Sequence, residues 1–299
     1  MKKFLFEIIM SKACNKRCEY CKLDFESQNI SNDSLDSLIN ILKWNKNSLD
    51  NVIINFFGWE PLLNFSWIKY FVNKTKNFDC LDYSIWTNWS LLDEEKLNFL
   101  IKNKFKIHLS FDSENTDTLL KNLHLKKWID NIEVNYIINP NTIKKSFNDF
   151  DKLISFWFKN INVMPVYFTL KWNKGSFVIL NQLLNKKIKK YIWENDYSIN
   201  FYSYYNWVSS DTQYILESDW TLYSDLDSLL WIQKQWWIIS DILSNEIEEK
   251  TTIGKIHNLW IDDIIKKHEI KDIIKLVHEI PKEQGLIMDY KILDKIFNG

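Results

Sequence analysis

The first two hundred residues contain six short apolar runs, each about as long as a β-strand. Several of the runs are nearly continuous, which is typical of parallel strands covered on both faces. The predicted strands are residues 4–11, 51–58, 82–88, 105–113, 132–140 and 161–168.

Between these runs, apolar positions recur at helical spacing. In the first such stretch, one face carries Leu35, Leu38, Ile39 and Leu42. Ser31 and Asp33 precede this face and are candidate helix caps. The other predicted helices are residues 66–77, 93–103, 116–130 and 143–157. Regular alternation of strand and helix predicts an α/β fold with six β/α units of a parallel barrel.

The pattern changes from about residue 174 onwards. A helix is predicted over residues 177–193, followed by irregular aromatic-rich segments and a helical stretch over 262–280. We therefore expect two parts, a core barrel over residues 1–195 and a small α+β extension over residues 196–299.

Composition narrows the class of protein. The chain has 299 residues, 46% of them hydrophobic, and a formal net charge of −1. Near-neutral charge gives no general attraction to nucleic acid or anionic lipid. No apolar stretch approaches the ~20 residues of a membrane span. We expect no nucleic-acid partner, no membrane association and a cytoplasmic location, where reducing conditions keep thiols free.

Three of the four cysteines, Cys14, Cys18 and Cys21, follow the first predicted strand in the run Cys-Asn-Lys-Arg-Cys-Glu-Tyr-Cys. Three thiolates on one loop can hold three irons of a [4Fe–4S] cluster and leave the fourth iron open to a ligand. A zinc site would need a fourth ligand, and no histidine lies nearby in the sequence. A disulfide suits a small secreted domain, and a lipoprotein signal would be interrupted by Glu7.

The Cys-x3-Cys-x2-Cys spacing, with Tyr20 before the last cysteine, resembles the signature of the radical S-adenosylmethionine (SAM) superfamily. The resemblance implies a partial (β/α)6 TIM-like barrel, a [4Fe–4S] cluster on the three cysteines, and SAM as cofactor. It also implies SAM contacts at the ends of strands two to five. The implied cofactor-binding residues are Tyr20, Gly58, Trp59, Glu60, Pro61, Thr87, Asn88, Ser110, Asp112 and Asn135.

Two residue counts are unusual. The chain has 5 glycines and 15 tryptophans, whereas ~7% average usage predicts about 21 glycines. Some bacterial lineages read the UGA codon as glycine and others as tryptophan, so we hypothesise that several tryptophans are glycine in the native protein. Glycine at Trp59 and Trp89 would give the superfamily's Gly-Gly-Glu-Pro and Thr-Asn-Gly segments. Trp44 and Trp157 stand where a glycine after a helix is expected.

The resemblance implies reductive cleavage of SAM to a 5′-deoxyadenosyl radical, which abstracts hydrogen from a substrate. Residues 219–223 and 253–256 are similar in outline to the SPASM or twitch extension of peptide-modifying members, including anaerobic sulfatase maturases. A peptide or protein substrate and a one-electron donor of the flavodoxin or ferredoxin type are therefore expected. No cysteine follows Cys80, which excludes an auxiliary cluster in this chain.

Two other interpretations remain open at this point. The substrate could be a small molecule such as a sugar, nucleoside or lipid precursor. The chain could also be a degenerate member that binds a cluster as a sensor or partner without catalysis. A true tryptophan at position 59 favours the second of these, because an indole there would crowd the methionine part of SAM.

Overall fold

The computed structural model describes residues 3–21, 29–45, 49, 51–112, 132–156, 158–166, 173–189, 191, 197–201, 213–216, 221–224 and 252–255. Seven parallel strands pair in chain order, which confirms the α/β class. They are β1 (Lys3–Ile9), β2 (Asn51–Phe57), β3 (Leu81–Thr87), β4 (Lys106–Phe111), β5 (Ile132–Ile138), β6 (Asn160–Pro165) and β7 (Ser198–Phe201).

Three more strands extend the sheet beyond β1. Strand β8 (Gln213–Leu216) pairs parallel to β1, and β9 (Thr221–Ser224) and β10 (Thr252–Lys255) follow in antiparallel order. The sheet runs from β10 at one edge to β7 at the other and is not closed. Strand β7 was not among the six predicted strands, because four residues are too few to reveal a period. It pairs with β6 although it follows residue 195, so the division of the chain at that residue stays a prediction.

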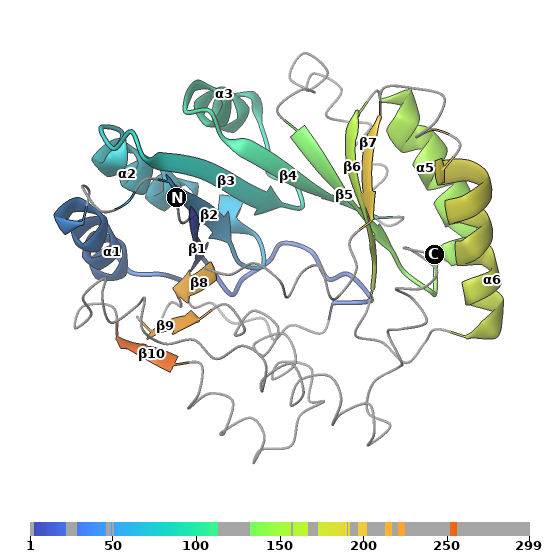
Figure 1. The fold of residues 1–299 in the computed structure, drawn as a ribbon, viewed down its shortest axis with the longest axis horizontal. Helices are drawn as coiled ribbons and strands as arrows, with labels where there is room; N and C mark the ends of the chain where they lie inside the picture. Colours follow the sequence, from blue (N-terminus) through green and yellow to red (C-terminus); the bar gives the residue numbers. More distant parts are fainter. Residues whose placement is uncertain are drawn as a thin grey trace.

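Five helices cover the outer face of the curved sheet (Figure 1). They are α1 (Asn32–Trp44), α2 (Phe65–Thr75), α3 (Glu94–Lys102), α5 (Ser146–Ser155) and α6 (Lys174–Gln182). Side-chain caps start several of them: Ser31 accepts a hydrogen bond from the amide of Ser34, as its position suggested. Helix α6 begins before the predicted residue 177 because Asn173 and Ser176 form a capping box. It continues as a π-helix, η5 (Leu183–Ile188). The predicted helix at 116–130 lies outside the described residues.

The structure does not support the glycine expected at position 44. Trp44 is the last residue of α1 and is 65% exposed, and the helix ends at Asn45, whose φ is −106°. The Asn45 side chain donates to the carbonyl of Ile41 and satisfies the helix end. The expectation that position 44 needs a glycine was therefore wrong. Trp157 lies outside the described residues.

The two faces of the sheet differ in chemistry. Alternate strand residues such as Phe6, Ile54 and Leu109 pack against the helices in one buried core. The intervening residues on the inner face include buried polar groups. There, Asn55 donates to Glu7 at 2.9 Å and accepts from Ser84 at 2.9 Å. Among the described residues, no helix combines the length and apolarity needed to cross a bilayer.

Candidate functional site

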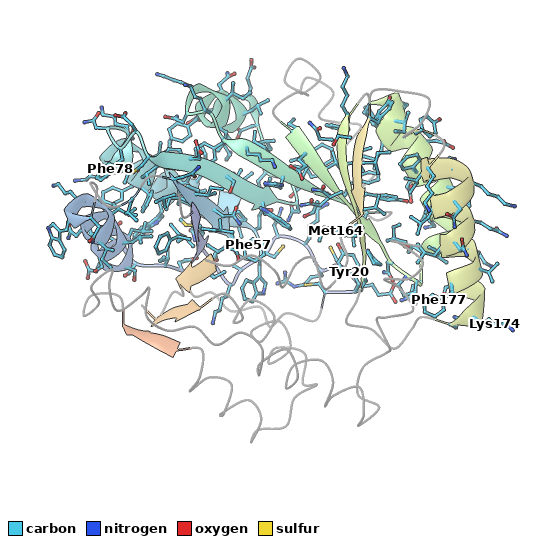
Figure 2. All side chains as sticks on the ribbon, in the orientation of Figure 1. Tyr20, Phe57, Phe78, Met164, Lys174 and Phe177 are labelled. Atoms are coloured by element: carbon cyan, nitrogen blue, oxygen red, sulfur yellow. The ribbon has the colours of Figure 1, made fainter. Side chains whose placement is uncertain are left out.

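Most of the predicted site residues converge at the carboxyl ends of β1 to β4, the edge where parallel α/β folds build their sites, whereas Asn135 lies in the middle of β5. The cysteine loop leaves β1, the segment 58–61 leaves β2, and Thr87 and Asn88 end β3. Figure 2 shows Phe57 and Tyr20 on the inner side of the sheet, away from α1, α2 and α3.

The cysteine loop is held by its own backbone and by Arg17. The amide of Lys16 donates to Cys14 Sγ at 3.3 Å, and the amide of Cys21 donates to the carbonyl of Cys18 at 3.0 Å. The Arg17 guanidinium donates to the carbonyl of Cys14 at 2.7 Å. These bonds order the loop around the first cysteine.

None of the three loop cysteines forms a disulfide, and all three side chains are half-buried. Burial raises the pKa of Cys14 above its ordinary value, while hydrogen bonds from Lys16 and Asn88 oppose that rise. In the described part of the chain, no three His, Cys, Asp or Glu side chains gather closely enough to hold a single metal ion. A [4Fe–4S] cluster makes a different demand, because each cysteine binds a different iron. Three cysteines on one loop match the ligand set that such a cluster needs.

Gly58 is required where the loops after β1 and β2 meet. Its φ is +114°, and an added Cβ would lie 2.6 Å from the carbonyl oxygen of Ser11. The next amide, that of Trp59, donates to the same Ser11 oxygen at 3.1 Å. Glycine thus permits the close approach that places residues 59–61 beside the cysteine loop.

Glu60 links the segment after β2 to the end of β3. Its buried carboxylate accepts from the Thr87 hydroxyl at 2.7 Å and from the Asn88 amide at 2.8 Å. It also caps the 3₁₀ turn η2 (Pro61–Asn64) by accepting from the amide of Leu62. Burial raises the pKa of Glu60 to about 6, although these three hydrogen bonds oppose that rise. The carboxyl group therefore keeps its proton to a higher pH than an exposed glutamate does.

Trp59 packs beside the first cysteine. Its side chain is 8% exposed and lies in a small apolar cluster with Ile9, Cys14 and Phe57. An indole therefore fills space next to a predicted cluster ligand.

Trp89 adopts a conformation that favours glycine. Its φ is 51°, and its side chain is 1% exposed. Its indole N–H is buried without a hydrogen-bond partner. A tryptophan in left-handed backbone is unusual, and a buried, unpartnered N–H costs about 1–3 kcal/mol. Among the described residues, Lys104 is the other non-glycine residue with a positive φ.

Tyr20, on the cysteine loop, contacts Asp112, which follows β4. The Tyr20 hydroxyl donates to Asp112 Oδ2 at 2.5 Å, which links the cysteine loop to the end of β4. Burial, and then the Asp112 charge, raise the pKa of Tyr20 well above its ordinary value. The tyrosine therefore stays protonated and serves as a hydrogen-bond donor.

Ser110 and Asn135 lie opposite each other on β4 and β5. The side-chain oxygen of Asn135 accepts a hydrogen bond from Asn162 Nδ2 at 2.9 Å. The Nδ2 of Asn135 itself is buried without a hydrogen-bond partner. An unused donor of this kind is a ready contact for a ligand oxygen or ring nitrogen.

Sequence reasoning missed the polar side chains that tie the cysteine loop down. Asn15 donates to Ser90 at 2.7 Å, and Asn141 donates to Glu19 at 2.6 Å. No sequence pattern marks these exposed pairs. The buried Glu133, by contrast, could have been noticed, because it alternates with Asn135 inside an otherwise apolar run.

A family model described as the Radical SAM superfamily matches residues 8–138 of the chain. A curated relative, the radical SAM cyclopropyl synthase TigE of Paramaledivibacter caminithermalis, is 28% identical over 232 residues. That match covers 67% of this chain and 48% of TigE. An uncharacterized protein of Archaeoglobus fulgidus is 28% identical over 130 residues, which are 40% of this chain and 29% of the relative. The chain thus spans less than half the length of these relatives.

Solved structures share the fold. The structure of anSMEcpe with bound AdoMet and the Cp18Cys peptide has a TM-score of 0.68 at 17% identity, covering 91% of this chain and 82% of that one. Streptococcus suis SuiB bound to its precursor peptide SuiA has a TM-score of 0.55 at 17% identity, with 74% and 59% covered.

Proposed function

We propose that this chain is an enzyme that reductively cleaves SAM, because its residues 8–138 match the Radical SAM superfamily, whose members use a [4Fe–4S] cluster and SAM. The observation that carries the proposal is the cysteine loop. Three cysteines that form no disulfide lie on one ordered loop at the carboxyl edge of a parallel sheet, beside the segment Gly58–Pro61.

We propose separate roles for the three cysteines, for the cofactors and for the rest of the protein. Cys14, Cys18 and Cys21 hold three irons of the cluster and leave the fourth iron to the amino and carboxylate groups of SAM. When bound, cluster and SAM together supply a 5′-deoxyadenosyl radical that abstracts a hydrogen atom from the substrate. The protein orders the loop and would position the cofactors.

The segment after β2 and polar residues on or just after β4 and β5 are proposed to orient SAM. The backbone of residues 58–61 and the Glu60 carboxylate are suited to its ammonium group, which needs acceptors. Ser110, Asp112 and Asn135 stand at the level proposed for its ribose and carboxylate. The unpartnered Nδ2 of Asn135 supports this assignment, because a bound cofactor would supply the missing acceptor.

We propose a peptide or protein side chain as the substrate and a flavodoxin or ferredoxin as the one-electron donor. The support is likeness, since anSMEcpe and SuiB were both solved with peptides. The extension over residues 196–299 would frame the substrate side of the barrel, and strands β7 to β10 are among its described parts. We propose a cytoplasmic setting, because reducing conditions there would keep the three loop cysteines available to iron.

We also propose that positions 59 and 89 are glycine in the native protein, through UGA recoding. The support at 89 is the left-handed φ of 51° with a buried, unpartnered indole N–H. At 59 it is the indole packed against Cys14, where an incoming SAM needs room. Mass spectrometry of peptides across residues 53–69 and 84–96 of the native protein tests both positions.

The contact between Trp59 and Cys14 also favours a second candidate function. If tryptophan is the native residue at position 59, the indole obstructs the place proposed for SAM. The chain would then hold a cluster as a sensor or as part of a complex, without cleaving SAM.

One assay separates the two functions. The protein is produced as written and as the Trp59→Gly/Trp89→Gly variant, reconstituted anaerobically with iron and sulfide, and incubated with SAM and dithionite. We expect 5′-deoxyadenosine from the double-glycine variant. Product no higher than in a variant with all three loop cysteines changed to serine would remove the enzymatic proposal. A cluster without product in both forms would support the sensor.

A further inference from the structure

The turn after β3 touches the first cysteine through one side chain. Asn88 Nδ2 lies 3.5 Å from Cys14 Sγ and 3.1 Å from Asn15 Oδ1. Asn15 in turn donates from Nδ2 to Ser90 Oγ at 2.7 Å. The cysteine loop and the β3 turn are thus joined by polar contacts at Cys14 and at the residue after it.

The hydrogen bonds around Asn88 decide which way its amide group faces. Its Oδ1 accepts from the Ser90 amide at 3.1 Å and from the Ser90 hydroxyl at 2.6 Å. Its backbone amide donates to Glu60 Oε2 at 2.8 Å. Since the oxygen is engaged by Ser90, the NH2 group must face Cys14 and Asn15. The protein's own hydrogen bonds therefore fix the direction of this donor.

We propose that Asn88 is a positioning residue for the cluster rather than a contact of SAM: it fixes Cys14 and donates an N–H···S hydrogen bond to its sulfur. This inference rests on the proposed function, because it requires that Cys14 ligate iron. Both hydrogens on Asn88 Nδ2 are directed at the cysteine loop, which leaves no side-chain donor for SAM. The Lys16 amide supplies a second donor to the same sulfur at 3.3 Å.

Hydrogen bonds to cluster sulfurs tune the reduction potential. Reduction adds negative charge to the cluster and its ligands, so an N–H donor stabilises the reduced state more than the oxidised one. Asn88 therefore raises the potential and makes the cluster easier to reduce. Such outer contacts also orient metal ligands, and their loss typically costs about 10–100-fold in metal affinity or activity.

Two substitutions separate the hydrogen bond to sulfur from the shape of the turn. Asn88→Asp is nearly isosteric and keeps an oxygen for the two Ser90 donors, but it replaces the N–H donor with a negative oxygen. Asn88→Ala removes both functions. The matched control is Asn103→Asp at the end of α3, where the asparagine donates to the carbonyl of Phe99 instead.

The experiment measures iron content and the midpoint potential by redox titration followed by electron paramagnetic resonance. We expect Asn88→Ala to lower the equilibrium constant for reduction by up to about tenfold, equivalent to 59 mV for one electron. Asn88→Asp is expected to lower it further, and Asn103→Asp to leave it unchanged. A folded Asn88→Asp protein that no longer loads iron would also support the positioning role.

Wild-type potentials in loaded Asn88→Asp and Asn88→Ala proteins would overturn the inference. If Asn88→Ala does not fold, Asn88→Asp carries the test alone. A wild-type protein that binds no cluster would instead sink the proposed function. If the wild-type protein cleaves SAM but the two Asn88 variants keep its potential and iron content, only the proposed role of Asn88 is refuted.

Discussion

Replacing Trp89 tests whether the backbone at this position requires glycine. A residue with a Cβ costs about 1–2 kcal/mol in left-handed backbone, and Trp89 has a φ of 51°. Glycine relieves that cost but loses about 0.5–1 kcal/mol through the greater entropy of the unfolded chain. The Trp89→Gly variant should therefore be about 0.5–1 kcal/mol more stable than Trp89→Ala.

Comparing glycine with alanine isolates the backbone effect. Either replacement gives up the packing of a buried indole, a loss of about 3–5 kcal/mol for Trp→Ala. Either one also removes the buried indole N–H that has no partner. Because alanine and glycine share these changes almost equally, the difference between the two variants reports the cost of a Cβ at this φ.

The matched control is Trp67, which lies within helix α2. There alanine should be more stable than glycine by about 1 kcal/mol, the usual helix preference. Urea unfolding followed by circular dichroism, with linear extrapolation, measures all four variants. If Trp89→Ala proves as stable as Trp89→Gly or more so, the reasoning from backbone conformation is refuted.

Three further outcomes are expected. Cys14→Ser should abolish both the cluster and 5′-deoxyadenosine formation, whereas Cys80→Ser, outside the loop, should keep both. Iron analysis and a product assay measure the two effects. A Cys14→Ser protein with a full complement of iron would contradict the assignment of Cys14 as a ligand. Glu60 has a pKa raised to about 6 in the folded protein. The folded state therefore holds its proton longer than the unfolded chain, and stability should fall by about 2 kcal/mol as pH rises from about 4.5 to above 6. Glu60→Gln should remove this decline in urea unfolding of the cluster-free protein, and an unchanged slope would contradict it. Tyr20→Phe deletes the 2.5 Å hydrogen bond to Asp112 and should cost about 1–3 kcal/mol by the same assay, so an unchanged midpoint would show that this bond adds nothing.

Local patterns in the sequence predicted much of the fold and of the site. Strand and helix periods predicted the α/β class, because burial of one face repeats at short, fixed intervals. The spacing of Cys14, Cys18 and Cys21 indicated the cluster loop, because all three ligands lie on one short segment. The Ser31 cap of α1 was also readable, since a cap acts only on the next few residues.

What only the tertiary structure decided depends on contacts between distant segments. Glu60 meets Thr87 across 27 residues, and Tyr20 meets Asp112 across 92, so both pairs depend on the register and order of the strands. The tertiary structure also separated two tryptophans that looked alike in sequence. Trp44 ends a helix in ordinary backbone, whereas Trp89 takes left-handed backbone in a turn held by Glu60 and Ser90. Composition can raise the question of glycine at such positions, whereas backbone geometry shows at which of them a Cβ is costly.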